Sequence, residues 1–261
     1  MYFNDIHIAI YLAIGFLGCL MGLTVGNLNE RFANHKEIFS KQAWKEIKIN
    51  FQPHYMLMTI TAIIYISVIY IVGIDMQSWY ANIDLITYIL LIPMLISAYM
   101  IDMKHEIIPN RLVINILELG LISTFANGIF NPNGTSIAFD RITGMFVGSG
   151  IFLIITLIGG AIAGKEAMGM GDVKLVGALG LFYGVTGVTA LSISSFFMGA
   201  LVAIIILIIR TIQKSEDKYV AFGPFIVASA ILMMFISPNT VFSLFMGLCM
   251  GLSNGIMNIF R

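Results

Sequence analysis

The sequence predicts an all-α membrane protein with about eight transmembrane helices, or nine if its last apolar stretch also crosses. Three observations carry this prediction. The chain is 59% hydrophobic and 11% charged, whereas soluble domains are about 45–50% apolar and about 25% charged. Its apolar runs approach the roughly 20 residues that a helix needs to cross a bilayer. The runs are continuous rather than alternating, which favours helices over a barrel.

The apolar segments define the expected elements in order. They are residues 6–28, 55–74, 85–101, 112–130, 142–163, 173–184, 187–210 and 222–237. The short segment 173–184 indicates a helix that starts deep in the membrane. The last stretch, 240–259, either crosses the bilayer or lies flat on it.

Two regions are expected along the chain. Residues 1–54 hold the first span and a cytoplasmic loop, and residues 55–261 form a polytopic domain. In the loop, apolar side chains recur every fourth residue between lysines, at Phe39, Ala43 and Ile47. This pattern predicts an amphipathic helix on an anionic membrane surface, with an ordinary solvated linker helix as the alternative.

Lysine and arginine residues indicate the orientation, because short cytoplasmic loops are enriched in both. If the N-terminus lies outside, 12 of the 14 fall in inside loops. These are Arg31, Lys36, Lys41, Lys45, Lys48, Lys104, Arg111, Lys165, Lys174, Arg210, Lys214 and Lys218. Arg141 falls outside, and the side of Arg261 depends on whether 240–259 crosses. The bias therefore predicts an outside N-terminus.

Two acids stand at the expected inner boundary, each joined to an apolar run. Asp102 follows "LISAYMI", and Asp172 precedes "VKLVGALGLF". The predicted topology returns both to the same membrane face. Two carboxylates that meet in a low dielectric share one proton, because two close anions are too costly there. One can then activate water while the other donates to a substrate carbonyl, which predicts an aspartic protease site.

Glycines and lysines accompany the two acids. "GMGD" places Gly169 and Gly171 before Asp172, and glycine permits close approach of another backbone, here an extended substrate peptide. Lys104 and Lys174 each stand two residues after an aspartate. We count these four as candidate substrate-binding residues. A helix-capping role for the aspartates remains the alternative.

The motifs of other membrane proteases are incomplete. His105-Glu106 begins a zinc-protease motif, but Pro109 stands where its second histidine belongs. "VGSG" lacks the first glycine of a GxSG serine site. The histidines and the two cysteines, Cys19 and Cys249, show no ligand spacing, so no metal site is predicted.

Glu118 lies inside a predicted span and keeps a second function class open. An acid within the membrane is a candidate functional residue, so a transporter or ion channel could use it together with the two aspartates. A transport site is expected near the midplane, often between inverted repeats, and the chain shows no repeat. The net charge is zero, and no binding of nucleic acid is predicted.

Four stretches resemble the type IV prepilin peptidases. "DMKHEIIPN" resembles the first-aspartate motif of the family, and "GKEAMGMGDVKL" resembles its GxGD loop. "AFGPFI" and "GFLGCLMGLTVGNLNERF" are similar to a later Phe-Gly-Pro-Phe segment and to the Gly-rich N-terminal span. The resemblance implies a membrane aspartic endopeptidase that cuts the leaders of prepilins or pseudopilins on the cytoplasmic side of the cell membrane. Asp102 and Asp172 would be its catalytic pair.

The resemblance also implies a second activity. Many members N-methylate the new N-terminus with S-adenosylmethionine, whereas proteolysis needs no cofactor. Typical members carry two CxxC pairs in the first cytoplasmic loop, read as a zinc site, but residues 29–54 contain no cysteine. We therefore expect no zinc and leave N-methylation open. The expected partners are prepilin or pseudopilin substrates and membrane lipid.

Overall fold

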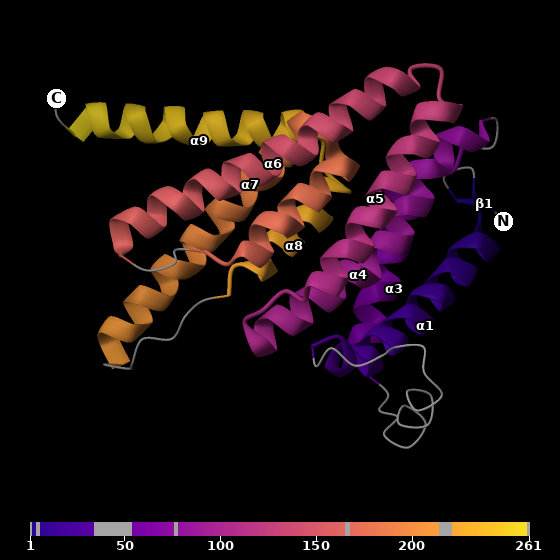
Figure 1. Ribbon diagram of the computed structural model, residues 1–261, viewed down its shortest axis with the longest axis horizontal. Helices are drawn as coiled ribbons and strands as arrows, with labels where there is room; N and C mark the ends of the chain where they lie inside the picture. Colours follow the sequence, from indigo (N-terminus) through magenta and orange to yellow (C-terminus); the bar gives the residue numbers. More distant parts are fainter. Residues whose placement is uncertain are drawn as a thin grey trace.

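The structure, a computed structural model, describes residues 2–3, 6–33, 54–75, 78–164, 168–213 and 221–259. Its helices are α1 (Ile8–Ala33), α3 (Tyr55–Val72), α4 (Ile83–His105), α5 (Asn110–Phe130), α6 (Gly134–Ala163), α7 (Met170–Gln213), α8 (Gly223–Met233) and α9 (Pro238–Ile259) (Figure 1). Two strands of two residues, β1 (Tyr2–Phe3) and β2 (Ile6–His7), pair antiparallel, and η1 (Trp79–Asn82) is a 3-10 helix. The predicted all-α class is confirmed.

Six helical segments of the described chain are long and apolar enough to cross a membrane. The count is seven if α8 and α9, bent by 117°, form one broken span. The protein is therefore polytopic, as predicted, although the count is lower than the eight or nine spans expected. The difference arises because 173–184 and 187–210 lie in one element, α7, and because 222–237 and 240–259 form the bent pair.

The backbone of α7 leaves the helical conformation at Gly184. This residue has φ 65° and ψ −172°, a conformation that glycine adopts without a steric penalty. A Cβ built on Gly148 of α6 would lie 2.6 Å from Val188 Cγ2 and 3.1 Å from the Val176 carbonyl oxygen. Residues on both sides of the break thus pack on the same point of α6, so the chain folds back at Gly184. The two arms correspond to the expected segments 173–184 and 187–210.

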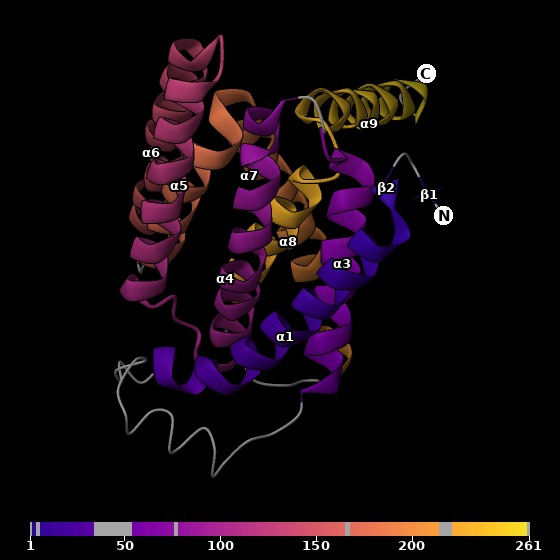
Figure 2. The same cartoon turned by 90° about the vertical axis from the view of Figure 1, so that its right-hand side faces the viewer.

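The helices form three groups side by side in Figure 1, and Figure 2 shows α3 on one side of the molecule and α5 and α6 on the other. α1 packs on α3 at one flank, α4 and α5 lie in the middle, and α6 and α7 pack on each other at the opposite flank. α8 contacts both α4 and α7. α9 extends away from the other helices (Figure 1). Asp102 lies in α4 of the middle group, and Asp172 lies in α7 of the α6–α7 group.

Small residues set the spacing at the α6–α7 contact. Gly144 and Gly180 face each other so closely that a Cβ on either would overlap the backbone of its partner. Helices in lipid commonly pack through close contact between their backbones, because the hydrophobic effect does not drive them together there. The arrangement fixes α7, and with it Asp172, against α6.

A buried ion pair ties α4 to α6 at the end of α4 opposite Asp102. Arg141 Nη2 donates to both carboxylate oxygens of Asp84, at 2.7 and 2.8 Å. Its Nη1 donates to Ser123 Oγ of α5 at 3.2 Å, and Asn127 Nδ2 donates to Asp84 Oδ1 at 2.9 Å. The sequence placed Arg141 in an outside loop. In the structure it lies within α6, with its charge paired.

Part of the predicted organisation lies outside the described residues. The amphipathic helix expected around Phe39, Ala43 and Ile47 falls in residues 34–53. The division of the chain after residue 54 stays a prediction.

Candidate active site

Asp102 lies in the last turn of α4 and is 5% exposed. The helix ends at His105, and Glu106 then adopts a left-handed conformation with φ 54°. The Glu106 N–H donates to the Asp102 carbonyl at 2.9 Å and closes this last turn. Pro109 starts α5 without needing an N–H partner. The carboxyl of Asp102 is therefore held beside a sharp reversal of the chain.

Asp172 lies in the first turn of α7 and is 8% exposed. Its N–H donates to the Gly169 carbonyl at 3.1 Å, so the GMGD stretch winds directly into the helix. Gly169 itself is exposed. An acid in a first helical turn is favoured by the positive end of the helix dipole. Asp172 is therefore held at the start of α7, and the exposed backbone of Gly169 precedes it.

The structure brings the segments that carry the two aspartates together. The Asp102 and Asp172 carboxyls are close enough to interact electrostatically. Ile108 lies between the two segments. Its Cβ is 3.1 Å from the position of a Cβ on Gly171, and its Cδ1 is 3.2 Å from the position of a Cβ on Gly223. Within the described residues, Asp102 Oδ2 is buried without a hydrogen-bond partner. A buried, unpaired oxygen beside a second carboxyl is suited to holding a shared proton.

Gly223 is a site residue that the sequence analysis did not include. It begins α8, and a Cβ at this position would lie 2.5 Å from Asp102 Oδ2. Only glycine lets the start of α8 approach the carboxyl so closely. The sequence signal for this residue is the "AFGPFI" stretch, which contains Gly223 and resembles a segment of the prepilin peptidases.

The predicted substrate-binding residues occupy different positions. Gly171 packs on Ile108, whereas Gly169 is open to solvent. Lys174 Nζ donates to Asn110 Oδ1 at 3.0 Å and links α7 to the start of α5. Lys104 is exposed near the end of α4. Contact of these four residues with a peptide stays a prediction.

The family model of the type IV leader peptidase family matches residues 89–208, a segment that includes both aspartates. This segment belongs to the type IV leader peptidase family. It runs from the middle of α4 through most of α7 and leaves out α1, α3, α8 and α9. No solved structure matches the chain.

Named relatives agree with this family. A prepilin leader peptidase/N-methyltransferase of Legionella pneumophila is 30% identical over 160 residues, which cover 60% of this chain and 53% of the relative. One of Pseudomonas aeruginosa is 30% identical over 132 residues, 51% of this chain and 43% of the relative. A type 4 prepilin-like proteins leader peptide-processing enzyme of Escherichia coli is 32% identical over 130 residues, 50% and 44%. The chain thus spans about half the length of the curated relatives that it matches.

The described residues contain no cluster of metal-binding side chains. No group of three or more His, Cys, Asp or Glu side chains lies close enough there to hold an ion. Glu118 is exposed on α5. The lack of a metal requirement stays a prediction that a chelator can test.

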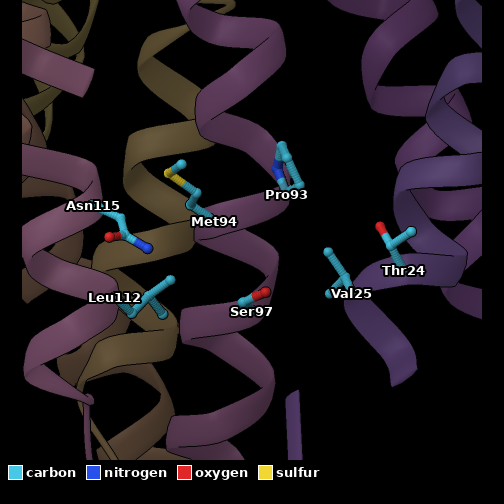
Figure 3. A pocket seen from close by; sticks show the side chains of 7 residues that line it. All are labelled: Thr24, Val25, Pro93, Met94, Ser97, Leu112 and Asn115. Carbon is cyan, nitrogen blue, oxygen red and sulfur yellow. The ribbon is translucent and has the colours of Figure 1, made fainter. Parts of the chain in front are cut away.

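A cavity of about 150 Å³ lies where α1 meets the leader peptidase segment. Its walls include Val25 of α1, Pro93 and Ser97 of α4, and Leu112 and Asn115 of α5 (Figure 3). We call it the seam cavity. It lies on the same helix as Asp102 and is separate from the two carboxyls.

Proposed function

We propose that the protein is a membrane aspartic endopeptidase that removes the leader peptides of type IV prepilins or pseudopilins. The observation that carries the proposal is the pair of buried carboxyls, Asp102 of α4 and Asp172 of α7, within a leader peptidase segment. The names of the relatives point to the same substrates.

The two aspartates divide the acid and base roles between them. One carboxyl is ionised and the other carries the shared proton. The ionised carboxylate takes a proton from a water molecule as the water oxygen attacks the scissile carbonyl carbon, and the protonated carboxyl donates its proton to the carbonyl oxygen. When the tetrahedral intermediate collapses, the C–N bond breaks, and the carboxyl that took a proton from water gives it to the leaving nitrogen. A hydroxyl of the intermediate returns a proton to the other carboxylate as the new carbonyl forms, which restores the pair. No cofactor takes part in these steps.

The proposed site faces the cytoplasm at the edge of the bilayer. The Lys and Arg distribution supports an inside position for the ends of α4 and α7 that carry the aspartates. A prepilin keeps its apolar helix in lipid and its leader in water, so the cleaved bond lies at their boundary. Gly169 and Gly171 would frame the peptide, and Lys104 and Lys174 would contact it. The membrane would be the inner, cytoplasmic membrane of the cell.

N-methylation of the new N-terminus is a second candidate activity, because relatives are named prepilin leader peptidase/N-methyltransferase. It would require S-adenosylmethionine. The seam cavity does not fit this molecule, since its lining has no acidic side chain for the sulfonium and no aromatic side chain for the adenine. The methyl-transfer reaction is therefore not assigned to described residues. The transporter alternative is not favoured, because the matched relatives are named as peptidases or peptide-processing enzymes.

Reconstituted protein tests both activities in one assay. Full-length protein in proteoliposomes is incubated with a prepilin, with and without S-adenosylmethionine, and the product N-terminus is analysed by mass spectrometry. We expect cleavage in both samples. An added methyl group only in the sample with donor would establish the second activity. An intact prepilin in every sample, under conditions where a known leader peptidase cleaves it, would contradict the proposed function.

A further inference from the structure

Glu106 directly follows the last residue of α4 and adopts a backbone conformation that favours glycine. Its φ of 54° and ψ of 31° lie in the left-handed region, and no other non-glycine residue in the described part of the chain has a positive φ. A side chain in this region is strained against its own backbone. α6 ends in the same conformation, but there the residue is Gly164, with φ 66° and ψ 11°. α4 thus carries a glutamate at a position where glycine would end the helix with less strain.

The carboxylate of Glu106 lies beside the aspartates and is available to bind another group. Glu106 is exposed, and its carboxyl is close enough to that of Asp102 to interact electrostatically. Lys104 and His105 directly precede it, yet the Glu106 side chain forms no ion pair or hydrogen bond with another described residue. An unpaired carboxylate at this place also repels the ionised member of the aspartate pair. Both the strain and the repulsion indicate that the charge of Glu106 serves a bound partner.

Glu106 lies at the end of α4 where a leader peptide would meet the aspartates. The chain reverses at Glu106, and α5 then begins at Asn110. In the proposed function the leader stays in the cytoplasm while the apolar helix enters the membrane, so the residues before the cleaved bond lie at this end of α4. The four residues from Asp102 to Glu106 correspond to about 6 Å of helix, which an extended peptide covers in about two residues. The second or third residue before the bond would then lie opposite Glu106.

The location of the leader also determines its chemistry. Segments that flank an apolar helix and stay in the cytoplasm are enriched in Lys and Arg. A carboxylate forms charge-assisted hydrogen bonds with either side chain. A leader cation beside Glu106 would also offset the repulsion between this carboxylate and the ionised aspartate. The charge of Glu106 is therefore complementary to the leader of the proposed substrate.

We propose that Glu106 binds a lysine or arginine of the leader, at the second or third position before the cleaved bond. This inference rests on the proposed function. The contact selects substrates with a basic leader and holds the peptide on the cytoplasmic side of the aspartates. Glu106 is thereby a specificity residue, and the two aspartates carry out the reaction.

Glu106→Gly separates binding by the side chain from the conformation of the backbone. If residue 106 only ended α4, glycine would leave cleavage unchanged. We expect the Tm to stay equal or rise, because glycine adopts the left-handed conformation without strain. KM for a prepilin with a basic leader should rise about fivefold, which is large for an exposed ion pair, with kcat nearly unchanged because the contact is made before and during the reaction. An unchanged KM would overturn the inference.

Reversal of the charge on both partners identifies the leader position. Glu106→Lys is assayed in detergent with synthetic prepilin peptides in which one leader Lys or Arg at a time is replaced by Glu. Either change alone should raise KM. The two together should restore it when the peptide is changed at the second or third position before the bond, as a double-mutant cycle detects. Additive effects at every leader position would overturn the inference.

Glu118→Gln is the matched control, because it removes an exposed acid of α5 instead. Its KM should equal that of the unmodified protein with every peptide. A rise in KM as large as that of Glu106→Gly would mean that loss of any acid weakens binding, which contradicts a specific contact. Failure of the unmodified protein to cleave any peptide would instead contradict the proposed function, whereas normal cleavage without coupling contradicts this inference alone.

Discussion

At the scale of single residues, the backbone of Gly223 confines the carboxyl of Asp102. A Cβ on Gly223 would lie 2.5 Å from Asp102 Oδ2 and 2.9 Å from its Cγ. A side chain on residue 223 would therefore overlap the carboxyl of Asp102. Any side chain at 223 must therefore move either Asp102 or the start of α8.

We predict that Gly223→Ala lowers kcat of prepilin cleavage by about tenfold to a hundredfold, because small displacements of reacting groups are costly. Purified protein and a synthetic prepilin suffice for the measurement. Gly150→Ala is the matched control, since a Cβ on Gly150 of α6 meets nothing within 4 Å. Equal rates in the two variants would show that the contact at Asp102 has no role in turnover.

The two aspartates could be predicted from sequence because each interrupts an apolar run at a membrane boundary. The contact with Gly223 could not. This contact joins α4 to α8, which are distant in the chain, and no local sequence pattern indicates which backbone will approach which carboxyl. The hydrogen bond between Lys174 and Asn110 could not be predicted either, for the same reason. Sequence identified the lysine beside Asp172 but not its partner.

At the scale of elements, the ion pair between Asp84 and Arg141 joins the middle helices to the α6–α7 flank. The Arg141 side chain is 9% exposed and that of Asp84 is 39% exposed. Ser123 and Asn127 complete the hydrogen bonds of the pair. Arg141 thus lies within α6 with its charge paired, rather than in an outer loop.

Arg141→Ala should destabilise the protein by about 3 kcal/mol, the low end of the range for breaking a buried ion pair, because Asp84 is partly exposed. The Tm of detergent-solubilised protein reports the effect. The double variant Asp84→Asn, Arg141→Ala should recover part of the loss, since it no longer buries an unpaired charge. A Tm of Arg141→Ala equal to that of the unmodified protein would mean that the ion pair does not stabilise the folded protein.

The course of α7 shows what sequence can and cannot say about elements. Apolar runs predicted segments 173–184 and 187–210, and both arms are present. Gly184 supplies the reversal between them with its positive φ. The sequence contains many glycines, and only contacts such as those of Gly148 with Val176 and Val188 show which one turns the chain.

At the scale of the whole molecule, orientation in the membrane decides whether the aspartates can meet a leader peptide. We predict that Lys36→Cys and Lys214→Cys, in a chain without its native cysteines, react with a membrane-impermeant thiol reagent only from the cytoplasmic side. Trp79→Cys should react only from outside. The reason is the concentration of Lys and Arg in the inside loops. Labelling of position 79 from the cytoplasm would reverse the topology and move the site to the wrong face.

Metal independence is a second prediction for the whole protein. Cleavage by purified protein should be unchanged in a strong chelator, because two carboxyls perform the chemistry without a metal ion. The control is the same preparation after addition of zinc. Activity that falls in chelator and returns with zinc would require a metal site.

The central claim is that Asp102 and Asp172 act as one catalytic unit. The most direct test measures turnover per folded molecule in Asp102→Asn, Asp172→Asn and the double variant. The control is Glu118→Gln, at an exposed position of α5. Asparagine keeps the shape of the side chain but cannot ionise or pass a proton. We predict that each single change abolishes cleavage, that the double change is no worse than either, and that Glu118→Gln retains most activity. Near-normal turnover in either folded single variant would contradict the account.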